Sequence, residues 1–443
     1  MAQTPLNCAI IGAGIVGLGA GIALRNSGHK ATIFEKSTFK NEIGAAITVA
    51  PNGNRILDHW GFDAKAAGET LKEQSRYVDP ETLELQIQLD LGDVRERFGH
   101  NFNAFHRCDL HQGLRELAES RGVKIVLGKE VVGLDCEKGE IQFKDAELQT
   151  FDMIVVADGI KSTFVNQISG SDAPLIKIGR SVFRGLIPMD LFLNDPLVRP
   201  IFENQPSGFY AALSKTGTFI MTYPCRNDKI LNVAIFHDTR ANHQDDQGWN
   251  SPATLEEVLE VLDGLHPAWK AIVKHAGDGM KCFPIAQREA LPRFNCGRAV
   301  VIGDAAHCMQ PVHAQGGAMG LEDAASLEIL FPPTFSPQKE SIPQRLQLLN
   351  DFRLPRVNTT QLYSNSQMQR NAKNNKDPVI TDHISAIRKF YKGPLMEMTA
   401  KPWGRRERQE FWYGYDVFVQ ARRAMEVRGR EGGLMQEEVR HFF

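Results

Sequence analysis

Short apolar runs alternate with helical patterns along much of the chain and predict an α/β fold. Apolar residues dominate 6–11, 30–34, 152–157 and 298–302, and a glycine or an acidic residue follows each run. Runs of this length are typical of strands that are buried on both faces. Residues 15–26 follow the first run with helical spacing, so we expect a parallel sheet covered by helices.

The pattern changes in the middle of the chain, where short alternating segments are separated by turns. The sequence predicts four strands there, at 181–187, 208–213, 218–223 and 231–237. Short connections favour antiparallel pairing. Apolar residues at helical spacing then predict a helix within 251–274, and 344–375 is expected to be one long polar helix interrupted near Pro355.

These patterns divide the chain into four parts. We expect a nucleotide-binding lobe in two pieces, a sheet lobe inserted between them, and a helical C-terminal region. The expected bounds are 1–175 and 291–330 for the first lobe, 176–290 for the inserted sheet and 331–443 for the C-terminal region.

Composition is that of an ordinary globular protein. The 443 residues are 42% hydrophobic and 23% charged, with a net charge of −2, which gives no reason to expect a nucleic acid partner. The seven cysteines form no CxxC pair, so we expect free thiols in a reducing, cytoplasmic compartment and no metal site. We also expect no signal peptide and no membrane span, because no run approaches 18 apolar residues.

The first strand and helix carry a dinucleotide-binding fingerprint. Gly12, Gly14 and Gly17 occupy the turn, and Glu35 ends the second strand 23 residues after Gly12. In this motif the first glycine permits a tight turn, the second lets the backbone approach a pyrophosphate, and the third lets the helix pack on the strand. The acid then binds ribose hydroxyls.

A second ligand-binding pattern lies at 297–325. Asp304 follows a predicted strand, and Gly316 and Gly317 precede a helical pattern. An acid can accept hydrogen bonds from ligand hydroxyls, and glycines at a helix start let backbone N–H groups approach a ligand. A simple strand-to-helix turn is the alternative.

The fingerprint alone does not distinguish NAD from FAD. Asp158 and Asp304 mark two further strand ends, and an extended ligand such as FAD would reach beyond the first site. No second GxGxxG follows a strand. We therefore expect one permanently bound FAD and a nicotinamide partner that binds transiently.

The motifs GAGIVG, ADGIKS, GDAAH and QGG, in this order, resemble those of the class A flavoprotein monooxygenases. The salicylate hydroxylase-like branch, with the phenol hydroxylases of secondary metabolism, is the most similar. The resemblance implies a glutathione-reductase-type FAD lobe with an inserted antiparallel substrate sheet. It also implies non-covalent FAD, NADPH or NADH as reductant, O2 as co-substrate, and hydroxylation through a flavin C4a-hydroperoxide.

Several residues match this family position by position. Ala46 lies in a loop that runs along the flavin, where glycine is common, so we expect a contact through its backbone. Arg107 matches an arginine that reaches FAD; the alternative is a helix-start arginine paired with a carboxylate. Asp158 matches the motif that touches the pyrophosphate, but the arginine that usually follows is missing from 164–167.

Four residues are candidates for the substrate site. Arg184, within an apolar strand, would stabilise a substrate phenolate or carboxylate, and Tyr223 would share a proton with a substrate oxygen. The alternatives are a structural ion pair for Arg184 and an ordinary strand tyrosine for Tyr223. Tyr210 is a weaker substitute, and His313 is a candidate pocket residue.

The sequence therefore predicts an FAD-dependent, NAD(P)H-using monooxygenase that hydroxylates a phenolic or other electron-rich aromatic small molecule. Epoxidation, N-hydroxylation or oxidative rearrangement of a secondary metabolite by the same flavin is the enzymatic alternative. A non-enzymatic binding protein is disfavoured because GAGIVG, Glu35 and GDAAH are all intact. A monomer and a homodimer are both compatible with the sequence.

Overall fold

The computed structural model describes residues 4–39, 45–244, 250–337, 340–372 and 405–430. Its N-terminal unit is built on a six-stranded sheet in the order β19-β20-β12-β1-β2-β8. The strands are β1 (Asn7–Ile11), β2 (Lys30–Glu35), β8 (Lys124–Leu127), β12 (Met153–Val156), β20 (Ala299–Val301) and β19 (Asn295–Cys296). All pairs are parallel except β19 with β20. The four strands predicted from apolar runs are all present.

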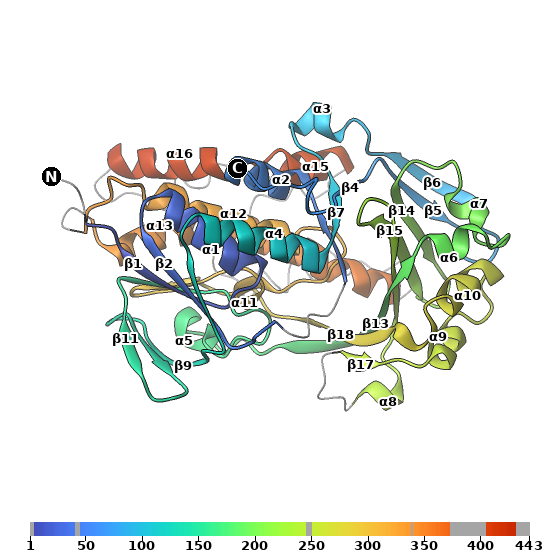
Figure 1. Cartoon of the computed structure of the whole chain (residues 1–443), viewed down its shortest axis with the longest axis horizontal. Helices are drawn as coiled ribbons and strands as arrows, with labels where there is room; N and C mark the ends of the chain where they lie inside the picture. Colours follow the sequence, from blue (N-terminus) through green and yellow to red (C-terminus); the bar gives the residue numbers. More distant parts are fainter. Residues whose placement is uncertain (1–3, 40–44, 245–249, 338–339, 373–404, 431–443) are drawn as a thin grey trace.

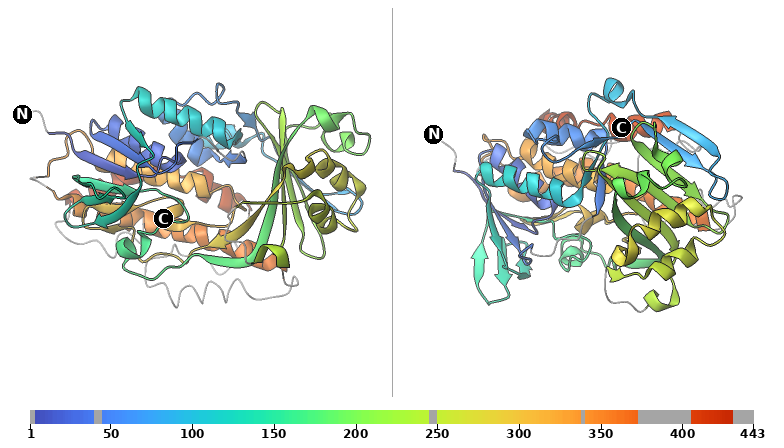
Figure 2. Two further views of the ribbon diagram at one scale, coloured as in Figure 1. Left: turned by 60° about the horizontal axis from the view of Figure 1, so that its bottom comes forward. Right: turned by 45° about the vertical axis from the view of Figure 1, so that its right-hand side comes forward.

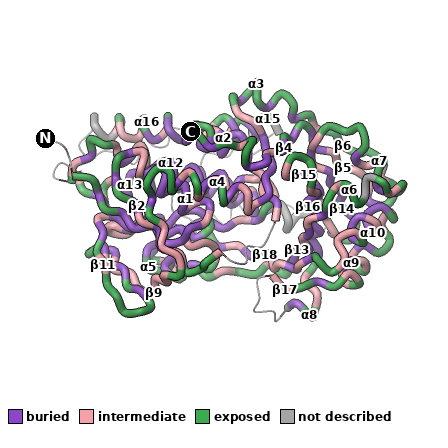
Figure 3. The backbone as a smooth tube through the Cα atoms, in the orientation of Figure 1, coloured by how far each residue is buried: buried purple, intermediate pink, exposed green. Residues whose placement is uncertain are grey.

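Helices and a small sheet cover this parallel sheet (Figure 1). The helices α1 (Ile15–Asn26), α4 (Arg107–Ser120) and α12 (Gly316–Leu330) pack together, with α1 in contact with both others. A three-stranded antiparallel meander forms the other layer: β9 (Val131–Asp135), β10 (Glu140–Phe143) and β11 (Leu148–Thr150). Phe34 joins the layers, because its ring lies 4.8 Å from that of Phe143. Figure 3 shows the buried backbone concentrated in α1, α12 and the parallel strands.

A second unit is an eight-stranded sheet at the opposite end of the molecule from the meander (Figures 1 and 2). Its order is β17-β18-β13-β16-β15-β14-β5-β6. The strands are β17 (Ser251–Pro252), β18 (Lys281–Gln287), β13 (Ile176–Pro188), β16 (Ile230–Asp238), β15 (Phe219–Cys225), β14 (Gly208–Leu213), β5 (Gln74–Val78) and β6 (Leu85–Asp90). The predicted mostly antiparallel sheet is confirmed, since only β14 and β5 pair in parallel.

Two features of this unit differ from the prediction. Strands β5 and β6 come from within 1–175, so a segment of the expected first lobe completes the inserted sheet. The single helix expected within 251–274 is instead two helices, α9 (Leu255–Val261) and α10 (Pro267–Lys274). Gly264 has a φ of +76° and Pro267 begins α10, and both features break a continuous helix.

A small antiparallel sheet of β3 (Ala46–Val49), β7 (Asn103–His106) and β4 (Thr70–Leu71) lies between the two units. The short helices are α2 (Pro51–Trp60), α3 (Val94–Phe98), α5 (Val165–Ser169), α6 (Asp190–Leu193), α7 (Arg199–Phe202), α8 (Ala241–Gln244), the 3-10 turn Gly277–Gly279 and α11 (Asp304–His307). These connect the sheets and place α11 directly after β20.

The C-terminal region contributes α13 (Ile342–Ala372), α15 (Arg405–Tyr413) and α16 (Val417–Arg430). The helix expected at 344–375 is not interrupted at Pro355, which lies inside α13. It is also less exposed than its polar sequence suggested, because Arg353 and Arg356 are fully buried. Within the described ranges, no helix combines the length and apolarity needed to cross a membrane.

Candidate active site

The three fingerprint glycines form the turn between β1 and α1. Gly12 has a φ of +99°, and a Cβ there would lie 2.6 Å from the carbonyl oxygen of Ala157. A Cβ on Gly17 would lie 1.9 Å from the carbonyl oxygen of Gly12, whereas nothing lies within 4 Å of a Cβ built on Gly14. The backbone of Gly14 therefore faces open space at the positive end of the α1 dipole. This geometry suits a phosphate.

Glu35 lies against this turn at the end of β2. Its Oε2 accepts a hydrogen bond from the backbone N–H of Ala13 at 2.9 Å, and its Oε1 accepts one from the N–H of Ser37 at 2.7 Å. Carboxylate oxygens have further acceptor capacity beyond one bond each. The position agrees with a ribose-binding acid, and that role stays a prediction.

Asp158 and Asp304 follow β12 and β20, which lie next to each other and beside β1 in the parallel sheet. One oxygen of Asp158, Oδ1, is buried without a hydrogen-bond partner among the described residues, and burial raises the pKa of this carboxyl to about 6. The side chain of Asp304 is exposed, yet the surrounding protein excludes enough water to raise its pKa, against the charges of His307 and Arg107. Both acids can therefore accept hydrogen bonds from a polar ligand.

Arg107 begins α4 and connects these acids to the second unit. Its charge opposes the rise that burial causes in the pKa of Asp304 and adds to the lowering that burial causes in the pKa of Arg184, so it lies near both groups. Within the described part of the chain, no carboxylate forms an ion pair with Arg107. The neighbouring acid, Asp109, is instead bound in a bidentate pair by Arg226. This arrangement favours a role toward a ligand over the alternative of a structural ion pair.

The backbone groups of Ala46, at the start of β3, have partners within the protein. Its N–H donates to Oδ1 of Asn232 at 3.4 Å, and its carbonyl oxygen accepts from the hydroxyl of Tyr223 at 3.2 Å. Both backbone groups are thus directed toward the eight-stranded sheet. A carbonyl oxygen can accept a second hydrogen bond, so the expected backbone contact of Ala46 with the flavin stays a prediction.

Gly316 and Gly317 form the first turn of α12. A Cβ on Gly316 would lie 3.9 Å from Oδ1 of Asp304, and one on Gly317 would lie 3.5 Å from Cδ1 of Ile47. The first N–H groups of a helix have no partner within it. The start of α12 therefore lies beside Asp304 and can present N–H groups to a ligand held there.

Arg184 and Tyr223 lie on one face of the eight-stranded sheet. Burial lowers the pKa of Arg184 and raises that of Tyr223, and the charge of Arg184 partly opposes the latter shift. Arg184 lies 5.7 Å from the ring centre of Phe283 and, within the described ranges, forms no ion pair with any carboxylate. Arg184 is half-buried, and a cation partly shielded from water without a carboxylate partner is stabilised when a ligand compensates its charge. The alternative of a structural ion pair for Arg184 is therefore not supported.

Tyr210 is not brought together with these two residues. It lies opposite Thr222 in the strand register, and Thr222 precedes Tyr223, so Tyr210 and Tyr223 point to opposite faces. The Tyr210 hydroxyl donates to the carbonyl oxygen of Pro206, and its ring packs 5.0 Å from that of Phe202. The structure therefore does not support Tyr210 as a pocket residue.

His313 lies in the loop before α12. Its ring centre is 4.6 Å from that of Trp412. Burial lowers the pKa of His313 to about 3, so the ring is neutral at ordinary pH, and its Nε2 has no hydrogen-bond partner among the described residues. The preceding residue, Val312, packs against a buried cluster that includes Val182 and Ala234, on the same sheet face as Arg184. The loop thus borders the face that carries the candidate catalytic residues.

Sequence reasoning missed two residues at this junction. Asn232 is a buried polar residue within the apolar strand β16, and its side chain accepts a hydrogen bond from the N–H of Ala46. A polar residue in an otherwise apolar strand was the one sequence signal that pointed to a tertiary contact. Trp412 packs in an aromatic cluster with Phe98 and Phe102 and also contacts His313, and nothing in the local sequence relates 412 to 313.

The geometry defines a flavin-type dinucleotide site. The residues fit FAD: a phosphate-binding turn at Gly14, an acid at Glu35, an unpaired buried oxygen on Asp158, and an accessible Asp304 beside the start of α12. The chain would hold the cofactor across the edge where parallel strands end, which is the usual ligand position in such sheets.

Comparison with known proteins shows the family. The model of the FAD binding domain family matches residues 6–331, and the chain belongs to this family. It is 30% identical over 372 residues to the FAD-dependent monooxygenase cfoG of Aspergillus candidus, covering 81% of this chain and 85% of that protein. It is also 30% identical over 354 residues to hispidin-3-hydroxylase of Neonothopanus nambi, covering 74% and 81%. The chain is thus an FAD-dependent monooxygenase, using NAD(P)H and O2 as this class does.

Solved structures share the fold. The crystal structure of CtdE with FAD and substrate 4 superposes with a TM-score of 0.78 at 20% identity, covering 96% of this chain and 99% of that chain. A salicylate hydroxylase substrate complex superposes with a TM-score of 0.75 at 22% identity, covering 95% and 98%. The predicted fold class is confirmed.

Proposed function

We propose that this monooxygenase hydroxylates a phenolic or other electron-rich aromatic small molecule. The observation that carries the proposal is the half-buried guanidinium of Arg184, which lacks a carboxylate partner among the described residues and lies on the same sheet face as Tyr223. A phenolate or carboxylate on the substrate would supply the missing negative charge. Relatives with aromatic substrates in their names support this class, among them hispidin-3-hydroxylase and, at 28% identity, 3-hydroxybenzoate 6-hydroxylase 1 of Aquipseudomonas alcaligenes.

The chain would hold FAD through its N-terminal unit. The Gly12–Gly17 turn would bind the pyrophosphate, Glu35 a ribose, and Asp304 the ribitol. The N–H groups of Gly316 and Gly317 would face the pyrimidine edge of the flavin, where the α12 dipole favours negative charge. When bound, FAD supplies electron transfer from NAD(P)H and the activation of oxygen.

The second unit would hold the substrate. Arg184 would stabilise the phenolate and so make the ring carbon more nucleophilic. Tyr223 would hold the substrate oxygen by a hydrogen bond, releasing or sharing its bond to Ala46. The apolar side chains of Met221, Phe283 and Val312 would exclude water.

The first test is NAD(P)H oxidation in air by the yellow protein, with and without phenols, aromatic acids and indoles. A large stimulation by one chemical group, with oxygenated product, is the expected result. If the protein is yellow but no aromatic compound stimulates its NAD(P)H oxidation, the result would contradict the proposal and favour a different flavin-dependent oxidation.

A further inference from the structure

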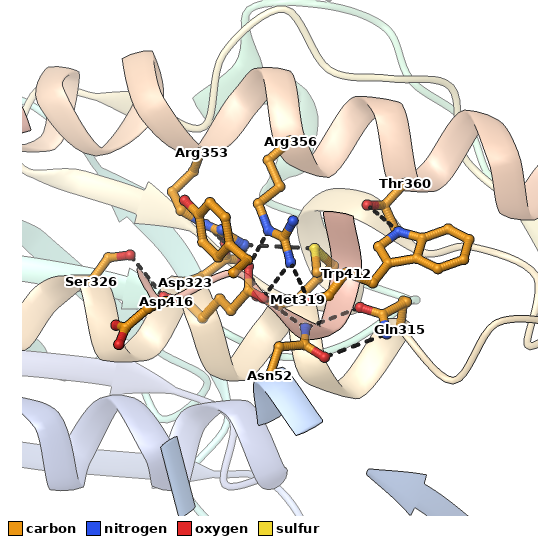
Figure 4. A network of polar contacts seen from close by, with 12 residues as sticks. Asn52, Gln315, Met319, Asp323, Ser326, Arg353, Arg356, Thr360, Trp412 and Asp416 are labelled. Atoms are coloured by element: carbon orange, nitrogen blue, oxygen red, sulfur yellow. Dashed lines mark hydrogen bonds and ion pairs between the residues drawn. The ribbon is translucent and has the colours of Figure 1, made fainter. Parts of the chain in front are cut away.

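A buried network of charged side chains lies behind the start of α12 (Figure 4). Glu322 and Asp323 of α12 face Arg353 and Arg356 of α13, and no more than 1% of any of the four side chains is exposed. Burial alone would raise the pKa of Glu322, but the charges of Arg356 and Arg353 hold it below its usual value. Two carboxylates thus balance two guanidinium groups, which is the condition for keeping such charges buried.

The carboxylates of this network hold the flavin side of the site. Asp323 accepts a hydrogen bond from the N–H of Gly303 at 3.1 Å, directly before Asp304. Glu322 accepts one from Asn52 at 2.7 Å, and Asn52 in turn donates to the side chain of Gln315, which precedes Gly316, at 3.0 Å. The network therefore fixes both the Asp304 turn and the first turn of α12.

Arg356 extends the network to a different part of the chain. Two of its nitrogens bind Glu322 at 2.7 Å each. Its N–H groups also donate to the carbonyl oxygens of Phe411 at 2.7 Å and Trp412 at 3.2 Å, at the end of α15. The planar fork of an arginine can bind a carboxylate and two carbonyls together, and a lysine cannot.

Arg353 is a natural comparison for Arg356. Both belong to α13, both bind Glu322, and both lie near the ring of Tyr415. Arg353 also donates to Asp323 at 2.9 Å and to the carbonyl oxygen of Met319 at 3.2 Å, both in α12, and among the described residues it forms no hydrogen bond with Phe411 or Trp412. The two residues thus differ in their further partners: Arg353 binds Asp323 and Met319 of α12, whereas Arg356 holds the end of α15.

Trp412 faces the substrate side of the site. Its indole N–H donates to Oγ1 of Thr360 in α13 at 3.2 Å, and its ring contacts His313. The same cluster includes Phe209, whose ring lies 5.4 Å from that of Tyr223. Trp412 and His313 therefore stand beside the sheet face that carries Tyr223, and α13 fixes Trp412 at its backbone and its side chain.

We propose that Arg356 is a positioning residue that holds Trp412 against His313 as one wall of the substrate site, and that Glu322 links this wall to the flavin-facing start of α12. The wall shapes the site for a planar aromatic ring. The inference rests on the proposed function, because it assigns part of the same substrate site.

The test compares Arg356→Lys with Arg353→Lys in the FAD-loaded enzyme. Both changes keep the charge and weaken buried bonds to carboxylates, those of Arg356 to Glu322 and those of Arg353 to Glu322 and Asp323, so both variants should lose stability. Only Arg356→Lys should raise the Kd of the aromatic substrate by about tenfold or more, as measured from the flavin difference spectrum, because misplacement of a positioning group has effects of this size or larger. The same variant should form less product per NAD(P)H oxidised. Equal effects of the two variants on Kd and coupling would overturn the proposal.

A milder variant covers the case in which Arg356→Lys fails to fold. Thr360→Val removes the acceptor of the Trp412 indole at nearly constant shape, and it should change Kd and coupling in the same direction. Wild-type Kd and coupling in this variant, when Arg356→Lys cannot be purified, would also overturn the proposal.

A ligand-free measurement separates this inference from the substrate assignment. Amide hydrogen exchange in 405–413 should become faster in Arg356→Lys than in Arg353→Lys without any aromatic compound present. Unchanged exchange there would refute the role of Arg356. If the exchange result is as expected but no phenol perturbs the wild-type flavin spectrum, the proposed function has failed and the positioning of α15 has not.

Discussion

Replacing Arg184 with alanine should reduce product formation strongly while leaving the flavin bound. Arg184 is a half-buried cation on the sheet face that carries Tyr223, and it lies outside the fingerprint turn. If a substrate phenolate lies about 4 Å away, the Coulomb attraction is about 4 kcal/mol at an effective dielectric constant near 20. Loss of one preorganised charge-stabilising donor costs about 10²- to 10³-fold in rate, so we expect kcat/KM to fall by at least about 10²-fold.

The pH dependence gives this variant a specific signature. A guanidinium beside the substrate lowers the pKa of its phenol, so removal of the guanidinium should move the acidic limb of the kcat/KM profile to higher pH. Activity should recover in part at alkaline pH, where the phenol ionises without help. Arg184→Lys restores the positive charge without the planar fork, and we expect it to recover part of the loss.

The assay is product formation and NAD(P)H oxidation across pH, with flavin content measured on the same samples. Arg76→Met is the matched control, because Arg76 belongs to the same sheet but lies over the ring of Tyr210, on the other face. Near wild-type turnover in Arg184→Ala, or an equal loss in Arg76→Met, would refute the assignment of Arg184.

Three further predictions concern the cofactor site and the buried charges. Asp304→Ala should be purified with little FAD, measured by absorbance, and full occupancy would exclude the ribitol role. Burial raises the pKa of Asp158 from 3.8 to about 6, so without FAD the folded state binds this proton more tightly than the unfolded state does. The free energy of unfolding should therefore fall by about 3 kcal/mol as pH rises from 4 to 6. Asp158→Asn should abolish this fall in urea titrations, and an unchanged pH dependence of the free energy of unfolding would contradict the prediction. Glu322→Gln should lower the free energy of unfolding by about 3 to 5 kcal/mol, because it leaves buried guanidinium charge uncompensated. The exposed control Glu256→Gln should change it by less than about 0.5 kcal/mol, and similar losses in the two variants would argue against a balanced network.

The nucleotide-binding half could be predicted because its signals are local. Gly17 is required by a close contact with Gly12 in the same turn, and Gly12 by a close contact with Ala157 at the end of the adjacent strand β12. Glu35 ends β2, the next strand in the sequence. Steric demands of this kind act over short distances, so they appear as fixed spacing in the sequence. The parallel strands were equally clear, since burial on both faces leaves a continuous apolar run.

The substrate side depended on relations that the local pattern does not contain. Side chains alternate in direction along a strand, so the sequence shows which neighbours of Tyr210 share its face within β14, and likewise for Tyr223 within β15. Only the pairing of β14 with β15 shows that Tyr210 and Tyr223 lie on opposite faces of the sheet. Two of the strands in that sheet, β5 and β6, come from early in the chain, and no periodicity assigns them to it. The backbone of Ala46 likewise meets side chains brought from β15 and β16, which its local sequence does not indicate.

The sequence by itself therefore determined the fold class, the FAD-binding turn and the acids at the strand ends, because each follows from residues adjacent in the chain or in neighbouring strands. Only the tertiary structure decided which side chains share the substrate face and what holds the start of α12. Arg353 and Arg356 occur in a segment that reads as a polar surface helix, yet burial against Glu322 and Asp323 makes them part of the core. A buried ion pair requires a partner of opposite charge from elsewhere in the chain, and a single polar segment does not reveal where that partner lies.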